Sequence, residues 1–101
     1  MGKTQKNEFE ISGKVIFVGM PDRISENFSK RLVVLEAYDG QYRQEVPYEF
    51  VNDNMSLVDG VNVNDWVNVD FICRGRKNIS RDGMAKWWPT LEGKTIVVDK
   101  S

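Results

Sequence analysis

Basic residues gather in one stretch of the 101-residue chain, directly before two adjacent tryptophans. Between residues 74 and 86, five basic side chains stand against one acidic side chain, so this stretch has a local charge of +4. The basic residues are Arg74, Arg76, Lys77, Arg81 and Lys86, and Trp87 and Trp88 follow them. Cations attract phosphates, and an exposed indole is a flat surface on which an unpaired base can stack. The stretch therefore predicts a nucleic-acid-binding surface.

The two tryptophans are expected to point in opposite directions. Neighbouring residues of a strand face opposite sides, so Trp87 and Trp88 cannot both fill a core if they lie on a strand. Leu91, further along, is expected to face inward. Alternation counted back from Leu91 then predicts that Trp87 faces inward and that Trp88 and Thr90 face outward. A bulge at Pro89 would reverse this. The stretch also has a simpler interpretation, a solvated hairpin tip whose cations keep an exposed edge from aggregating.

Other residues are candidates for the same surface. Arg43 is a candidate phosphate contact, although Glu45 shares its expected strand face and would form an ion pair with it. Tyr48 is a candidate ring, since a tyrosine often buries its ring while its hydroxyl reaches water. Further candidate rings are Tyr42, Trp66 and Phe28, of which Trp66 also fits a barrel lid. The rings expected in the core, on apolar alternating faces, are Phe9, Phe17, Phe50 and Phe71.

The average charge of the chain hides two opposite regions. Fourteen basic and fifteen acidic residues give a net charge of -1. Between residues 36 and 70, however, eight acidic residues stand against one basic residue, a local charge of -7. Charges more than about 10 Å apart are largely screened at physiological salt, so a partner responds to the local patch. The acidic segment supports an alternative hypothesis, a β-barrel module that docks a protein partner through this face.

The residue types argue against catalysis and cofactors. The chain has no histidine, which removes the commonest proton-transfer group and the usual base for a hydroxyl or thiol nucleophile. One cysteine and no histidine offer no zinc cluster. We therefore expect a protein that is not an enzyme and uses no metal or other cofactor. The sequence has neither a secretory signal nor a run of about 18 apolar residues, so we expect a cytoplasmic protein without membrane contact.

The length fits one domain, and hydrophobic periodicity predicts mostly strands. Residues 1–7 are expected to form a flexible N-terminus, residues 8–98 one domain, and residues 99–101 the C-terminal end. Strands are predicted at 9–17, 31–38, 41–50 and 66–74. Residues 86–98 are expected to form a last strand, or a pair of strands interrupted around Glu92-Gly93. Loops are predicted at 19–30 and, for the basic stretch, at 75–85. The dipeptide Asp39-Gly40 favours a tight hairpin turn between the second and third strands.

Particular residues predict local irregularities in these strands. Gly13 indicates a bulge or bend that lets the first strand serve both halves of a barrel. Pro47 cannot donate to a ladder, so that point should lie at an edge or bulge. Between 51 and 63 a short helix is expected, capped by Asn52 or Asp53 and ended by Gly60. Five strands with a helix between the third and fourth predict an all-β, five-stranded OB-fold Greek-key barrel, with an SH3-like barrel as the alternative.

Several segments resemble the small OB-fold single-stranded DNA-binding proteins of bacteria and bacteriophages. The similar segments are Phe9–Val15, Leu35-Glu36, DWVNVDF at 65–71 and GMAKWWPTLEGKTI at 83–96. The resemblance implies that the basic hairpin and the groove aromatics hold the strand. Bacterial housekeeping members carry a glycine-rich extension with an acidic tip, whereas this sequence ends at Ser101. We therefore expect a compact phage-type or accessory protein, acting in DNA replication, recombination or repair.

The resulting hypothesis is sequence-tolerant binding of single-stranded DNA through stacking and phosphate contacts. No residue pattern diagnoses a contact to a 2′-hydroxyl, so RNA stays open as the natural strand. An exposed edge strand would also allow a homodimer. Besides the protein-docking alternative, an oligosaccharide-binding barrel that uses the same indoles is a third hypothesis.

Overall fold

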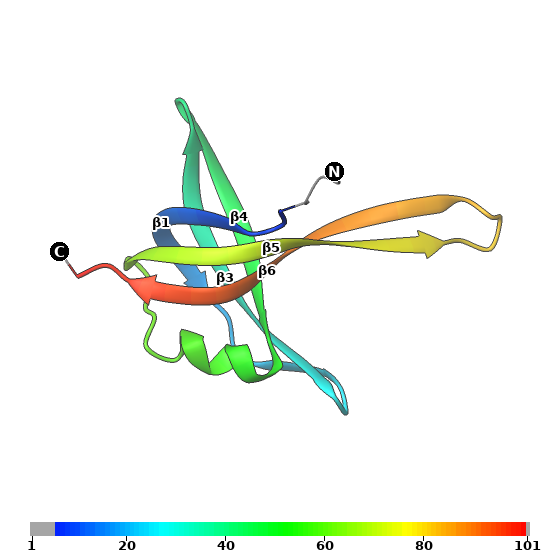
Figure 1. Cartoon of the computed structure of the whole chain (residues 1–101), viewed down its shortest axis with the longest axis horizontal. Coiled ribbons are helices and arrows are strands. Elements are labelled where there is room, and N and C mark those ends of the chain that lie inside the picture. The colour runs from blue at the N-terminus through cyan, green and yellow to red at the C-terminus, as the bar shows by residue number, and fades with distance from the viewer. Residues whose placement is uncertain (1–5, 101) are drawn as a thin grey trace, which may run out of the picture.

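The chain forms six β-strands and one short 3-10 helix in the computed structural model, which describes residues 6–100 (Figure 1). In chain order these are β1 (Phe9–Val18), β2 (Asp22–Ser25), β3 (Phe28–Asp39), β4 (Tyr42–Val51), η1 (Asn52–Val58), β5 (Trp66–Ile79) and β6 (Ala85–Val98). The expected flexible segment 1–7 lies outside the described residues except for Lys6 and Asn7, and so does Ser101. The Asn7 side chain donates to the Cys73 carbonyl at 2.9 Å and accepts from the Cys73 N–H at 3.1 Å.

The strands close into a barrel. The sheet order is β1-β5-β6-β4-β3-β2, and an additional pairing of β1 with β3 joins the two sides. Because β2 pairs with β3 alone, the barrel itself has five strands, and η1 lies between the third and fourth of them. This confirms the predicted OB-fold Greek-key barrel and excludes the SH3-like alternative.

β1 serves both halves of the barrel, as predicted. Its first half pairs with β5 from Phe9 to Lys14, and its second half pairs with β3. The irregularity lies between Val15 and Phe17, however, rather than at Gly13. Gly13 is required for another reason: a Cβ at this position would lie 2.7 Å from the Glu36 carbonyl oxygen. The glycine therefore permits a close approach of two backbones.

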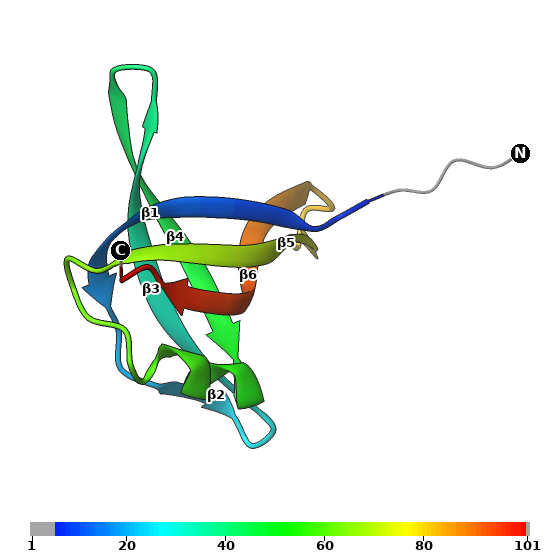
Figure 2. The same ribbon diagram turned by 60° about the vertical axis from the view of Figure 1, so that its left-hand side comes forward.

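β3 and β4 form the predicted hairpin, which rises out of the barrel (Figure 2). Asp39 pairs with Tyr42, so the two-residue turn is Gly40-Gln41, one residue later than predicted. Gly40 has a φ of 61°, a conformation that a glycine adopts without steric cost. Pro47 pairs with Val34 across the hairpin. On its other edge β4 pairs with β6 through Glu49 alone, so Pro47 lies beside an unpaired edge, as predicted.

The core fills the closed part of the barrel. Its buried residues are Val15, Val33, Leu35, Tyr48, Phe50, Val58, Val61, Val67, Val69 and Ile96. Of the four phenylalanines predicted in the core, Phe50 is buried and Phe71 packs against the core. The predictions for Phe9 and Phe17 are wrong, since these rings are 47% and 50% exposed. Phe9 is the first residue of β1, at the end of the strand. The irregularity between Val15 and Phe17 turns Phe17 to the outer face, opposite Val34, and places Val18 against the core instead.

Helix η1 covers one end of the barrel, with Val58 as its buried residue. The prediction that Asn52 or Asp53 caps it is wrong, because Val51 occupies the N-cap and no side chain caps the helix. The Asn52 side-chain oxygen instead accepts a hydrogen bond from the Ser29 N–H at 3.0 Å. Asn52 therefore ties the helix to the start of β3.

Two segments predicted as loops are arms of extended hairpins. Segment 19–30 contains β2 and the start of β3, and segment 75–85 contains the end of β5 and the first residue of β6. All four residues of β2 are exposed, as are the outer halves of β5 and β6. A strand exposed on both faces needs no apolar alternation, so periodicity cannot detect it.

Candidate nucleic-acid interface

The β5–β6 hairpin carries the basic residues away from the barrel (Figure 1). Its strands pair as far as Ile79 and Ala85, so the connecting turn spans only 80–84. In the turn the Ser80 hydroxyl donates to Asp82 at 2.6 Å and thereby lowers the pKa of that carboxyl, and Gly83 has a φ of 79°. Four of the five basic residues consequently lie on strands with a fixed face, and Arg81 alone lies in the turn.

The register gives the hairpin two different faces. Arg76 is the cross-strand partner of Trp88, and Lys77 is the partner of Trp87. The Lys77 Nζ lies 5.5 Å from the Trp87 ring centroid, within range of a cation–π interaction. Trp87 is 67% exposed and Trp88 56%, so the prediction of an inward Trp87 is wrong. The two rings do point to opposite faces, but the hairpin extends beyond the core that would bury one of them.

A cleft of about 690 Å³ lies between the β2–β3 and β5–β6 hairpins. Ile24 and Phe28 line it from the first hairpin, and Trp88 lines it from the second. Polar side chains from the second hairpin also line it: Arg74, Arg76, Asn78 and Thr90. The cleft thus combines aromatic rings, cations and neutral hydrogen-bonding groups, the combination that a base and its phosphate require.

Ion pairs occupy the barrel side of this cleft. Glu92 is 7% exposed, and its carboxylate accepts from Arg74 Nε at 2.6 Å and from Lys94 Nζ at 2.8 Å. Burial raises the pKa of Glu92, but these hydrogen bonds outweigh it and the net shift is downward. The bond to Glu92 correspondingly raises the pKa of Arg74. Arg74 therefore lines the cleft as an oriented side chain whose charge is compensated in part, because it shares Glu92 with Lys94.

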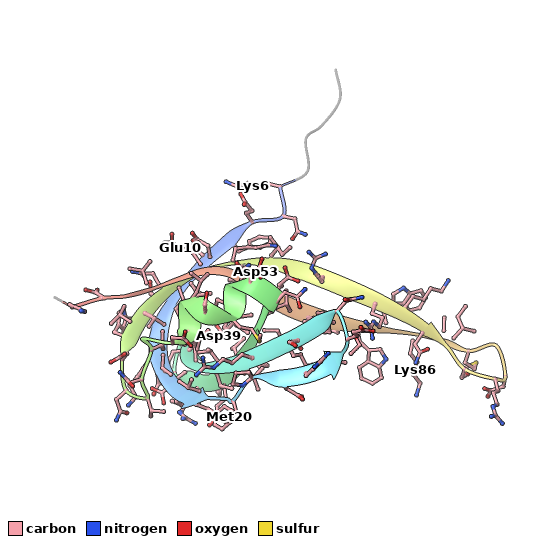
Figure 3. All side chains as sticks on the ribbon, turned by 90° about the horizontal axis from the view of Figure 1, so that it is seen from below. Lys6, Glu10, Met20, Asp39, Asp53 and Lys86 are labelled. Atoms are coloured by element: carbon pink, nitrogen blue, oxygen red, sulfur yellow. The ribbon has the colours of Figure 1, made fainter. Side chains whose placement is uncertain are left out.

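The remaining cations of the hairpin are available to an anion. Within residues 6–100, Arg76, Arg81 and Lys86 form no ion pair with a carboxylate. Figure 3 shows Lys86 on the outer part of the hairpin, far from Asp39 and Asp53. Arg76 alone among the three lines the cleft. The unpaired positive charge therefore runs from the cleft toward the hairpin tip.

Two candidate residues lie outside both the cleft and the β5–β6 hairpin. Tyr48 is 1% exposed and packs edge-on against Phe71, with 5.0 Å between ring centroids. Burial also raises the pKa of its hydroxyl, and the ring is not available for stacking on a base. Arg43 lies on the β3–β4 hairpin, where Nε donates to Glu36 at 2.5 Å and Nη1 donates to Glu45 at 2.6 Å. Neither residue belongs to the proposed interface.

Sequence reasoning did not select several residues of the cleft. Ile24 and Lys30 lay in a segment predicted as a loop, and Asn78 and Thr90 are small neutral residues without a distinctive signal. Phe28 was a candidate ring, and the structure places it in the cleft. An isolated phenylalanine and isoleucine in an otherwise polar stretch are the signal that identifies this wall.

The acidic segment 36–70 does not offer one unpaired face. Four of its eight carboxylates form ion pairs: Glu36, Glu45, Glu49 and Asp59. Asp65 accepts from the Asn62 N–H, and Asp70 accepts from the Thr95 hydroxyl. Six of the eight are therefore engaged within the fold, which weakens the case for a protein-docking surface here.

Residues 6–100 contain neither a metal-binding cluster nor a membrane-spanning helix. No group of three or more metal-binding side chains is arranged to hold a metal ion in this part of the chain. The same residues include no helix with the length and apolar character needed to cross a bilayer.

The closed barrel with its short helix defines an OB-fold protein. Two crystal structures of Rim1, a mitochondrial single-stranded DNA-binding protein from S. cerevisiae, share the fold with TM-scores of 0.71 and 0.70. They are 14% and 13% identical to this chain, and each comparison covers 94% of this chain and 96% of that one. By sequence, the chain belongs to the family described as a domain of unknown function (DUF3127), whose model matches residues 10–96. No curated protein gives a match.

Proposed function

We propose that this protein binds single-stranded DNA, with little sequence preference and without catalysis, in the cleft between the β2–β3 and β5–β6 hairpins. The observation that carries the proposal is the pairing of an exposed Trp88 with Arg76 at one cross-strand position of one cleft, where Arg76 forms no ion pair with any residue from 6 to 100. The ring supplies a stacking surface, and the guanidinium supplies a phosphate contact beside it.

The energetics favour an unpaired strand over a duplex. Stacking of a base on an aromatic side chain contributes about 1–3 kcal/mol per base, and the ring faces of a duplex are already stacked on each other. Phe28 on the opposite wall provides a second ring in the same cleft. Bases thus enter between the two hairpins, while the phosphates follow the cations.

The outer residues of the hairpin extend this site. Arg81 and Lys86 attract the backbone beyond the cleft, and Trp87 with Lys77 offers a second ring and cation on the opposite face. Arg74 acts mainly through its ion pair with Glu92, which fixes the strand that carries Arg76.

The setting of this activity is also proposed. Rim1 supports single-stranded DNA as the partner at the level of the fold, while RNA stays an alternative. A role in replication, recombination or repair in the cytoplasm of a bacterial or phage-infected cell follows from the sequence resemblance alone. A homodimer through an edge strand is part of the same proposal.

A fluorescence titration with oligothymidine at two salt concentrations tests the proposal. We expect tryptophan quenching with an affinity that falls as salt rises. Trp66→Ala is a matched control, because Trp66 is exposed but lies outside the cleft. Quenching that survives in Trp88→Ala and is lost in Trp66→Ala would remove the proposed site. Saturable but salt-independent binding of an oligosaccharide would favour the carbohydrate alternative.

A further inference from the structure

Two carboxylates line a cleft that is proposed to bind a polyanion, and phosphate binding does not explain them. Glu49 of β4 and Glu92 of β6 are register partners where the two strands meet in parallel. A carboxylate repels phosphates, so their presence indicates that the barrel side of the cleft receives bases rather than backbone.

The two carboxylates differ in what they can still accept. Glu92 is occupied: Oε1 accepts from Arg74 Nε, and Oε2 accepts from Lys94 Nζ and from Arg74 Nη2 at 3.4 Å. Glu49 has one contact, an ion pair of 3.5 Å between Oε2 and Lys30 Nζ. Within residues 6–100, the Glu49 carboxylate accepts no hydrogen bond besides this ion pair, and the side chain is 26% exposed. Glu49 therefore keeps acceptor capacity that faces the cleft.

An ionised carboxylate accepts hydrogen bonds and donates none. Cytosine offers its N4 amino group, and adenine and guanine also carry amino groups, whereas thymine presents carbonyl oxygens on both sides of its N3–H. We propose that Glu49 is a specificity-determining residue that favours amino-bearing bases over thymine. This inference rests on the proposed function and names the base class that the same cleft prefers.

The neutral polar groups of the cleft do not impose this choice. The Asn78 amide and the Thr90 hydroxyl can each donate or accept, so they accommodate any base. Cytosine and thymine have rings of one size, so a comparison of these two bases holds stacking nearly constant. A difference between them therefore reports on hydrogen bonding.

The experiment compares oligocytidine with oligothymidine of equal length, titrated into the parent protein and Glu49→Gln at neutral pH. We expect the parent to bind oligocytidine more tightly, and Glu49→Gln to reduce the ratio of the two affinities about two- to tenfold, because the amide can donate as well as accept and therefore serves either base. Glu49→Ala removes the acceptor altogether and should reduce the ratio as well. Thermal unfolding of each variant verifies that it is folded.

Glu45→Gln is the matched control, since it removes a carboxylate from the same strand outside the cleft. It should leave the ratio unchanged. Loss of the Lys30 ion pair, or of negative charge in general, changes both affinities by the same factor and leaves the ratio at its parental value. A ratio that is equal in parent and Glu49 variants overturns the inference while the proposed function stands. Failure of both oligomers to bind the parent protein overturns the proposed function and this inference together.

Discussion

Two hairpins project from the same barrel with exposed aromatic rings and arginines, yet their charges are arranged differently. On β3–β4, Arg43 is held between Glu36 and Glu45. The hydrogen bonds to these two carboxylates raise the pKa of the guanidinium. On β5–β6, Arg76, Arg81 and Lys86 have no carboxylate partner within residues 6–100. An arginine whose charge is compensated by two carboxylates gains little from a phosphate. The presence or absence of a compensating carboxylate, more than the presence of cations, therefore separates the two hairpins.

Removal of an aromatic ring should give the largest difference in binding affinity between the two hairpins. Trp88→Ala should weaken binding of oligothymidine by about 1–3 kcal/mol, or roughly 5- to 150-fold, because it removes a stacking surface. Tyr42→Ala removes an exposed ring from the β3–β4 hairpin and should change affinity less than about twofold. Equal losses in the two variants, measured by anisotropy of a labelled oligomer, would erase the distinction between the hairpins.

The arginines give a smaller contrast, most visible in the salt dependence. Arg76→Ala should weaken binding a few-fold at low salt and reduce the slope of log K against log salt by about 0.7, the loss of one phosphate contact on a single strand. Arg43→Ala should leave the slope unchanged, because its charge is compensated by two carboxylates. Titrations across a salt series measure both slopes. A reduced slope in Arg43→Ala alone would place the strand on the other hairpin.

Glu92, which pairs with Arg74, and Glu36, which pairs with Arg43, predict a contrast in acid stability between the two hairpins. The pKa of Glu92 and that of Glu36 both lie below the ordinary value of 4.5. Each therefore contributes stability that is present above pH 4.5 and is lost as the pH falls through the folded-state pKa. Glu92→Gln should cost about 1 kcal/mol at neutral pH and flatten the acid limb of the stability curve more than Glu36→Gln, because the Glu92 side chain is less exposed. Denaturant unfolding at several pH values tests this, and a larger effect of Glu36→Gln would contradict it.

Substitution of the turn glycines should give the smallest difference between the two hairpins, and it should appear in DNA binding rather than in stability. Gly40 and Gly83 both have positive φ and open space where a Cβ would stand, so alanine at either position is strained by backbone conformation alone. We expect each substitution to cost about 1 kcal/mol and to lower the Tm by about 4 °C. Only Gly83→Ala should also weaken DNA binding, since its turn orients the basic hairpin. Identical binding by both variants would show that the turn geometry does not contribute.

The barrel could be predicted from the sequence because buried strands leave a periodic signal. Val67 and Val69 alternate with polar residues and are buried as expected, and the Asp39-Gly40 dipeptide located the hairpin to within one residue. The same logic failed for Phe9, which lies at the end of its strand, and for Phe17, which the bulge after Val15 turns to the outer face. Alternation carries no information on how far the neighbouring strands extend or on where a bulge reverses it.

The candidate site could be predicted only in part. The clustering of Arg76 with Trp88 was visible in the sequence because both lie on one hairpin. The opposite wall, with Ile24, comes from a hairpin about fifty residues earlier, and only the closure of the barrel brings the two together. Likewise, the sequence suggested a partner for Arg43 in Glu45, but the second carboxylate, from Glu36, depended on the strand register.

The indole N–H signals of the three tryptophans test the central claim most directly. In a ¹⁵N-labelled protein, each of Trp66, Trp87 and Trp88 gives one such signal, which single Trp→Phe variants assign. On titration with oligothymidine, we predict the largest shift for Trp88, which lines the cleft, and little or none for Trp66, which lies outside it. A shift confined to Trp66, or three unchanged signals at saturating oligomer, would contradict binding between the two hairpins.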